Sequence, residues 1–99
     1  MIKHIVLFKL KDTVSPEEKL RAMTAFKNAI EALPSRISLI RKIEVGLNVN
    51  PAEAFDVALY SEFDSLEDLN TYAVHPDHVA AGRLLADVKE SRSCVDYKY

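Results

Sequence analysis

The hydrophobic residues of this chain recur with two different spacings. In four segments they stand at about every second position, which is the period of a β-strand. Between these segments they recur at every third or fourth position, which is the period of an amphipathic α-helix. The four predicted strands are residues 2–10, 37–47, 55–63 and 92–99.

The first predicted helix has clear start and stop signals. Ser15 is suited to the N-cap, Pro16 to the first helical position, and Glu18 completes a capping box. Pro34 ends the helix. Its apolar stripe consists of Leu20, Met23, Phe26, Ile30 and Leu33. We expect this stripe to pack on a sheet.

The second helical region is interrupted. Ser65 and Asp68 repeat the capping pattern, and Leu66, Leu69 and Tyr72 follow at helical spacing. Pro76 should break this helix, because proline lacks the backbone N–H and disfavours helical geometry at the residue before it. A further helical run is predicted from residue 77, with its apolar residues at Val79, Leu84, Leu85 and Val88.

The order of elements is therefore β-α-β-β-α-β, with a turn predicted at residues 48–54. This order predicts an α+β fold of the ferredoxin-like class, in which one four-stranded antiparallel sheet carries its helices on one side. Ninety-nine residues suffice for one domain but not for two, so residues 1–99 are predicted to form a single domain.

Both faces of the predicted sheet carry apolar side chains. An uncovered face should be polar, yet Ile5 and Leu7 stand opposite the face that holds Val6 and Phe8. The chain has no spare helix to cover this second face, so a second copy of the sheet is the simplest cover, and a homodimer is predicted. The expected interface residues are Ile5, Leu7, Ala58 and Tyr60. The alternative is a monomer with scattered apolar surface residues.

Composition narrows the classes of partner. Thirteen Lys and Arg against 15 Asp and Glu give a formal charge of -2, which argues against a nucleic-acid partner. The apolar run at residues 5–8 is far shorter than a membrane span of about 20 residues. Cys94 is the only cysteine, so no internal disulfide is possible, and we expect a cytoplasmic protein that does not bind membranes.

Candidate chemistry is concentrated in the segment from Tyr72 to His78, where Pro76 brings several polar groups into one corner. His4 shares a strand face with Val6 and Phe8 and should point towards the same interior. We expect Tyr72, His78 and His4 to line one pocket between the sheet and the helices. Imidazole suits a proton acceptor near neutral pH, and a phenol suits a hydrogen-bond donor.

Each candidate also has a structural interpretation. His4 is a core histidine that donates to a backbone carbonyl in that interpretation, His75 caps the broken helix, and Tyr72 packs in the core. Cys94 is expected to be a small core or interface residue. A metal site would have to use His75 and His78 with Asp77 or His4, but Pro76 disturbs the alignment of the two histidines. The sequence thus predicts no metal and no cofactor.

Five segments, in order along the chain, resemble the stress-responsive A/B barrel (Dabb) family. They are residues 2–12, Phe55 to Leu59, Phe63 to Leu66, Tyr72 to His78, and Val95 to Tyr97. The resemblance implies a homodimer in which two four-stranded sheets pack into a dimeric α/β barrel with the helices outside. Some family members are associated with stress tolerance, and many have no known activity.

The resemblance also implies a set of pocket residues. A plant enzyme of the family closes a linear polyketide by aldol chemistry, using a Tyr and a His that match Tyr72 and His78. Its N-terminal pocket His matches His4, but Val57 stands where that enzyme has another pocket His. Helix residues that shape the pocket also differ. The expected substrate pocket is His4, His75, Val57, Phe26 and Met23.

Two functions follow as hypotheses. The first is a dimeric, stress-linked protein in which the Tyr–His cluster is structural or binds a small molecule. The second is a cofactor-free enzyme, of cyclase, isomerase or lyase type, that acts on a small apolar or aromatic carbonyl compound. In the second, His78 removes a proton next to the carbonyl, and Tyr72 donates a hydrogen bond to the resulting enolate.

Overall fold

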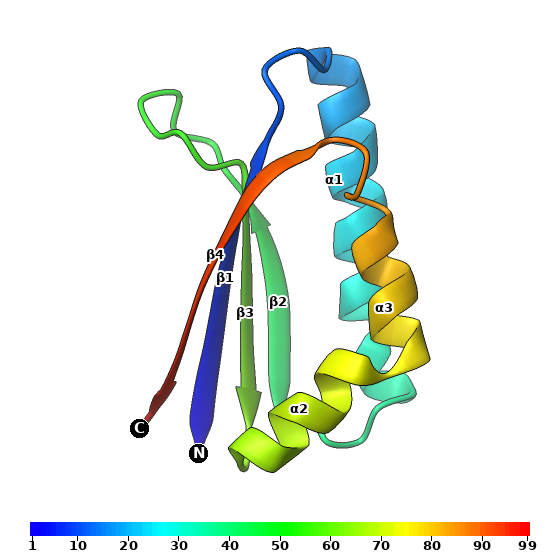
Figure 1. Ribbon diagram of the computed structural model, residues 1–99, viewed down its shortest axis with the longest axis vertical. Helices are drawn as coiled ribbons and strands as arrows, with labels where there is room; N and C mark the ends of the chain where they lie inside the picture. Colours follow the sequence, from blue (N-terminus) through cyan, green and yellow to red (C-terminus); the bar gives the residue numbers. More distant parts are fainter.

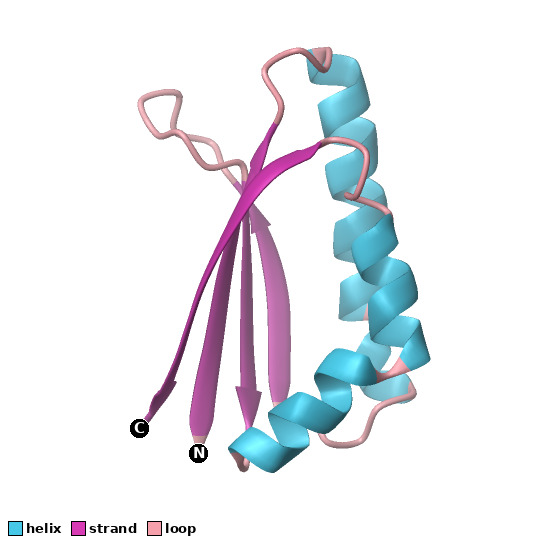
Figure 2. Ribbon diagram, in the orientation of Figure 1, coloured by secondary structure: helices cyan, strands magenta, loops and turns pink.

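A computed structural model describes all 99 residues and shows one antiparallel sheet with its helices packed on one side (Figures 1 and 2). The strands lie in the spatial order β2-β3-β1-β4. The predicted α+β, ferredoxin-like arrangement is thereby confirmed. Its elements are β1 (Ile2–Leu10), α1 (Pro16–Glu31), the 3-10 helix η1 (Leu33–Ser35), β2 (Lys42–Leu47), β3 (Val57–Phe63), α2 (Leu66–Val74), α3 (Pro76–Arg83) and β4 (Lys89–Lys98).

The register of the central strand β1 decides which residues face the helices. His4 lies opposite Ser61 of β3 and Asp96 of β4. Phe8 lies opposite Arg92 of β4. Directly opposed residues in antiparallel strands project from the same face, so Asp96 and Arg92 share the helix-facing side with His4 and Phe8.

The helix starts follow the predicted capping chemistry. The Ser15 hydroxyl accepts from the backbone N–H of Glu18 at 3.2 Å, and Ser65 accepts from Asp68 at 3.1 Å. These bonds pair N–H groups that have no partner within the first turn of a helix. The break before Pro76 is also confirmed, because His75 is extended and separates α2 from α3.

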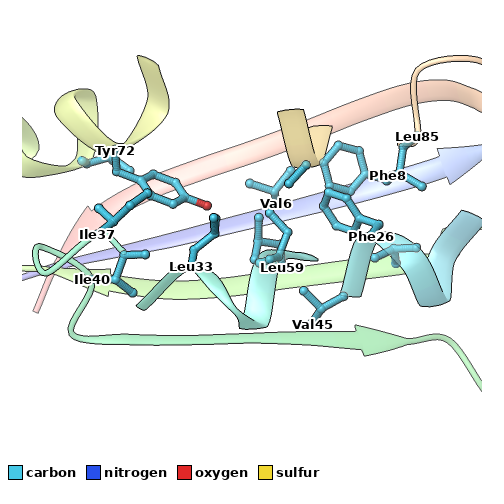
Figure 3. Packing of buried hydrophobic residues seen from close by; sticks show 14 of the residues in the cluster. Val6, Phe8, Phe26, Leu33, Ile37, Ile40, Val45, Leu59, Tyr72 and Leu85 are labelled. Carbon is cyan, nitrogen blue, oxygen red and sulfur yellow. The ribbon is translucent and has the colours of Figure 1, made fainter. Parts of the chain in front are cut away.

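The core lies between the sheet and the helices, and 17 buried residues form it (Figure 3). Alternate residues of β1 are buried, so one face of that strand belongs to the core. The rings of Phe8 and Phe26 join β1 to α1 edge to face, with their centroids 5.4 Å apart. The sheet and the long helix α1 are thus held together by aromatic as well as aliphatic contacts.

The predicted boundaries of three strands need correction. The strand predicted from residue 37 begins only at Lys42. Ile37 and Ile40 lie in the turn before it, and both are buried in the core. Their alternation therefore reflects two buried anchors of a connection, not extended backbone. β3 begins at Val57 instead of residue 55, and β4 begins at Lys89 instead of residue 92.

Several residues predicted to be buried are exposed in the single chain. Leu20 of α1 is 56% exposed. Leu66, Val79 and Leu84 are exposed as well, although they follow helical periodicity. Cys94 is also exposed in the single chain, so of the two predicted positions, core or interface, the core is excluded and the interface stays a prediction. No helix in the structure is both long and apolar enough to cross a membrane.

The face of the sheet away from the helices, here called the open face, is covered by no element of the chain (Figure 2). Ile5 and Leu7 are half-buried there, and Val95 is 53% exposed. The loop between β2 and β3 projects from this side of the sheet and away from all helices (Figure 1). The open face therefore presents both an apolar surface and a protruding loop to the surroundings.

Candidate functional site

A cavity of about 360 Å³ lies between the helix-facing side of the sheet and helices α1, α2 and α3. It is called the central cavity below. Its apolar lining includes Val6, Phe8, Phe26 and Leu59. Its polar lining consists of His4, Tyr72, His78, Arg83, Lys89 and Arg92. The volume falls in the range of about 300–1,000 Å³ that is usual for small-molecule pockets.

Tyr72 has no hydrogen-bond partner for its hydroxyl, although the residue is completely buried. The Ser65 cap fixes the start of α2, and the helix then turns Leu69 and Tyr72 towards the sheet. Burial raises the pKa of Tyr72 well above its ordinary value, so the phenol stays protonated. A buried hydroxyl without a partner costs about 1–3 kcal/mol, which a bound acceptor would offset.

His78 lies in the first turn of α3 and presents one free ring nitrogen. Its Nδ1 is 2.9 Å from the carbonyl oxygen of Ala73. Because a carbonyl oxygen only accepts, the hydrogen is on Nδ1, and in the neutral ring Nε2 carries a lone pair. Burial lowers the pKa of His78, and the nearby His4 and Arg92 act in the same direction. The neutral form therefore predominates at pH 7.

Tyr72 and His78 are adjacent. Their ring centroids are 4.3 Å apart, with the ring planes inclined by 44°. A neutral imidazole with a free lone pair thus lies beside a protonated phenol with a free hydroxyl, on the wall of one cavity. This pair can accept one proton and donate one hydrogen bond to the same small molecule.

His4 completes the polar corner from the sheet. It is buried, and its ring centroid is 6.5 Å from that of Tyr72. Its Nδ1 bonds to the carboxylate of Asp96, which the register of β1 and β4 places directly opposite. The predicted bond to a backbone carbonyl is therefore replaced by one to a side chain. Asp96 holds the His4 ring in place, as a carboxylate commonly orients a functional histidine.

The structure does not bring every expected pocket residue to the central cavity. Phe26 lines it, but His75, Val57 and Met23 do not. His75 is the N-cap of α3, where its Nδ1 accepts from the N–H of Asp77 at 3.1 Å. Val57 is buried at the start of β3, and Met23 packs at the margin of the core. The break between α2 and α3 at His75, the start of β3 at Val57 and the orientation of α1 decide these positions.

His4, Cys94 and Asp96 are the one group that could hold a metal ion, since one atom from each lies within 4.8 Å of the others. Nδ1 of His4 is already bonded to Asp96. Burial and the neighbouring Asp96 raise the pKa of the Cys94 thiol, which disfavours the thiolate that a metal requires. His75 and His78, the pair of candidate ligands weighed from the sequence, use their Nδ1 atoms for backbone contacts.

Three basic residues of the lining were not expected from the sequence. Arg83 ends α3, while Lys89 and Arg92 belong to the first half of β4. The available signal was the strand period, since Arg92, Cys94 and Asp96 alternate along β4. Strand alternation alone does not tell which face of the sheet Arg92 occupies. Its pairing opposite Phe8 places it on the helix-facing side, at the cavity.

The chain is similar both to solved structures and to proteins of known sequence. A crystal structure of a dimeric protein of unknown function and ferredoxin-like fold from Bacteroides fragilis is 66% identical, with a TM-score of 0.98, over 99% of this chain and 95% of that one. The Arabidopsis thaliana stress-response A/B barrel domain-containing protein DABB1 is 33% identical over 98% of this chain. The chain spans only 46% of that protein.

A more distant relative is the olivetolic acid cyclase of Cannabis sativa, which is 24% identical over 97% of this chain and 94% of the enzyme. The sequence profile of the stress responsive A/B barrel domain matches residues 2–99. That match covers nearly the whole chain and agrees with the observed order of strands and helices. The chain belongs to the stress responsive A/B barrel domain family.

Proposed function

We propose that this protein is a homodimer that binds a small organic molecule in the central cavity. The observation that carries the proposal is the Tyr72 hydroxyl, which is buried on the cavity wall without a partner. Buried polar groups are nearly always hydrogen-bonded, and exceptions commonly mark a site completed by another molecule. A stress-linked role rests on the names of family relatives alone.

The open face supports the homodimer. It exposes apolar residues on β1 and β4, and a hollow of about 390 Å³ lies between Leu7 and the projecting β2–β3 loop. A second copy would cover both features at once, as expected for a two-fold interface. The relative from Bacteroides fragilis, 66% identical to this chain, is described as dimeric. Two such sheets packed face to face form the dimeric α/β barrel.

The cavity can be tested with a neutral aromatic ketone as the probe. Acetophenone has an apolar ring and one carbonyl acceptor, which matches the apolar lining and the Tyr72 hydroxyl. We expect backbone NMR signals of Tyr72, Ala73 and Gly82 to shift on titration with acetophenone. Absence of any shift at millimolar probe would contradict binding in this cavity.

Gly82 offers a variant that fills the cavity. It lines the cavity, and a Cβ at this position would meet no atom within 4 Å, so a side chain fits without moving the backbone. Gly82→Leu should abolish the acetophenone shifts. Ala80→Leu is the control, because Ala80 is exposed on the same helix and does not line the cavity. Equal binding by both variants would place the probe elsewhere.

A second candidate function is cofactor-free proton transfer, which the adjacency of His78 and Tyr72 favours. Nε2 of His78 would take a proton from the carbon next to a carbonyl group. The electrons of that C–H bond form the enolate double bond, and the carbonyl oxygen takes the negative charge. Tyr72 donates a hydrogen bond to this oxygen, and the imidazolium then returns the proton.

Proton exchange measures this chemistry directly. In D₂O the methyl protons of acetophenone should be replaced by deuterium faster with the protein than without it. His78→Ala should reduce the rate to background, and Tyr72→Phe should reduce it by about 10²-fold, the usual effect of removing one oxyanion donor. Background exchange with folded wild-type protein would leave binding as the function and remove the catalytic candidate.

A further inference from the structure

Resting on the proposed binding function, we propose that the ligand of the central cavity is an apolar or aromatic carboxylate. Its carboxylate would bind the cluster of Arg83, Lys89 and Arg92, here called the basic cluster. Its apolar body would lie against the aliphatic and aromatic lining, and an acceptor atom would reach the Tyr72 hydroxyl.

The three residues of the basic cluster line the cavity from two separate elements. Arg83 comes from the end of α3, and Lys89 and Arg92 come from β4. Lys89 lies opposite Leu10 and Arg92 opposite Phe8, so both leave the strand on its helix-facing side. The Lys89 ammonium is 6.0 Å from the centre of the Phe8 ring. The Lys89 ammonium therefore borders apolar surface of the cavity.

No carboxylate of the protein neutralises the basic cluster. Other cationic side chains form ion pairs, including Lys9, Lys27 and Arg41. None of the three members of the basic cluster does so, and no Asp or Glu lines the cavity. A chain with a formal charge of -2 thus has a binding cavity whose charged residues are all basic. Such a lining attracts an anion.

The polar groups of the cavity are spread along its length. His4 and Phe8 are four residues apart on β1, which corresponds to about 13 Å in a strand. Tyr72 and His78 lie near His4, whereas Arg92 lies opposite Phe8. The Tyr72 hydroxyl points along the sheet towards Val6, and the Phe8–Phe26 pair lies beyond it (Figure 3). A ligand with an acceptor at one end and an anion at the other fits this arrangement.

Two arginines favour a carboxylate, because the guanidinium fork binds its two oxygens in parallel. A phosphate monoester would satisfy the same donors, so the test includes both. The probes are 4-acetylbenzoate, its uncharged carboxamide 4-acetylbenzamide, 4-ethylbenzoate and 4-acetylphenyl phosphate. The first has both the carbonyl acceptor and the carboxylate. Each of the others changes one of these groups.

Isothermal titration at low salt should show that 4-acetylbenzoate binds at least about tenfold more tightly than 4-acetylbenzamide, since a hydrogen bond to a charged group contributes about 1.5–3 kcal/mol. 4-Ethylbenzoate should bind more weakly than 4-acetylbenzoate, because it leaves Tyr72 without an acceptor. Tighter binding of 4-acetylphenyl phosphate would replace the carboxylate by a phosphate and overturn the assignment.

Substitution of Arg92 tests whether the basic cluster causes the preference for carboxylate over carboxamide. Arg92→Gln should reduce the ratio of carboxylate to carboxamide affinity at least threefold, with roughly unchanged affinity for the carboxamide. Arg21→Gln is the matched control, because Arg21 is exposed on α1 and neither lines the cavity nor forms an ion pair. Thermal midpoints of both variants should match that of the wild type.

The outcomes separate this inference from the function on which it rests. Equal binding of carboxylate and carboxamide, with no effect of Arg92→Gln, would overturn the inference and leave the proposed cavity function intact. Absence of binding by all four probes and by acetophenone would overturn both. A preference for the carboxylate that is lost equally in Arg21→Gln would reflect net charge alone, and would also overturn the inference.

Discussion

The two faces of the sheet are built from alternate residues of the same strands, yet they end in opposite states. On β1, His4, Val6 and Phe8 are buried beneath the helices, whereas Ile5 and Leu7 remain half-buried on the open face. Apolar residues alternate regularly on both faces of β1, so the local sequence does not explain why one face is buried and the other half-exposed. The cause is that three helices are sufficient to cover only one face.

The tyrosine hydroxyls of the two faces differ in whether they have a hydrogen-bond partner. On the open face the Tyr60 hydroxyl donates to Glu62 at 2.6 Å, and the Tyr99 hydroxyl donates to the other oxygen of that carboxylate. The bond to Glu62 raises the pKa of Tyr60 to about 12. On the helix-facing side, Tyr72 is buried and has no partner. The Tyr72 hydroxyl is thus the one buried polar side-chain atom that the protein leaves without a partner.

Each face of the sheet lacks a partner of a different kind. The open face lacks apolar partners over an extended surface, which a second copy of the chain can supply. The helix-facing side lacks one acceptor at a single buried atom, which the proposed small molecule would supply. Substitutions on each face should therefore affect assembly or binding selectively.

Leu7→Glu should have the largest effect, on assembly. Burial of a leucine contributes about 1.5–3 kcal/mol, and a two-fold interface contains two copies. The loss of about 3–6 kcal/mol should raise the dissociation constant of the dimer at least a hundredfold. Sedimentation equilibrium at micromolar concentration measures this change. Leu20→Glu, at an exposed position of α1, is the control. A monomeric mass for the wild type would contradict the dimer.

Phe63→Ala should destabilise the fold from the other face. Phe63 is fully buried in β3, and its ring packs 4.9 Å from that of Tyr72. Removal of such a ring costs about 3–5 kcal/mol. Urea unfolding at fixed protein concentration should show this loss. Val74→Ala, at a position that is 75% exposed, should change the free energy of unfolding by less than about 0.5 kcal/mol.

Tyr72→Phe should stabilise the protein without ligand by about 1 kcal/mol, because it removes a buried hydroxyl that has no partner. Tyr60→Phe should produce a smaller change of opposite sign, because it removes a hydroxyl bonded to Glu62. Thermal unfolding of both variants provides the comparison. Clear destabilisation by Tyr72→Phe would mean that this hydroxyl has a partner within the protein.

The smallest effect concerns pH. Burial lowers the pKa of His78 below its ordinary value of 6.5, so the unfolded chain takes up this proton first as the pH falls. The contribution of neutral His78 to the free energy of unfolding is complete above pH 6.5. It is lost as the pH decreases towards the pKa of His78 in the folded protein. His78→Asn should therefore show a weaker decrease in stability between pH 6.5 and 5 than the wild type. Parallel curves from urea unfolding would contradict the lowered pKa.

The sequence alone determined the elements and their order. Caps at Ser15 and Ser65 and the break at Pro76 are local, because each depends on hydrogen bonds within a few residues. The alternation of β1 likewise needs no tertiary information. These features fixed the fold class, the second apolar face and the proximity of Tyr72 to His78 along the chain.

Tertiary structure decided the rest. Ile37 and Ile40 alternate like strand residues but are buried from a turn, because burial and extended backbone produce the same pattern. Asp96 meets His4, and Arg92 reaches the cavity, only through the register of two strands about 90 residues apart. His75 became a cap while His78 joined the cavity, because the direction of α3 depends on its packing against α1 and α2. Such placements arise from long-range contacts, which no local spacing in the sequence encodes.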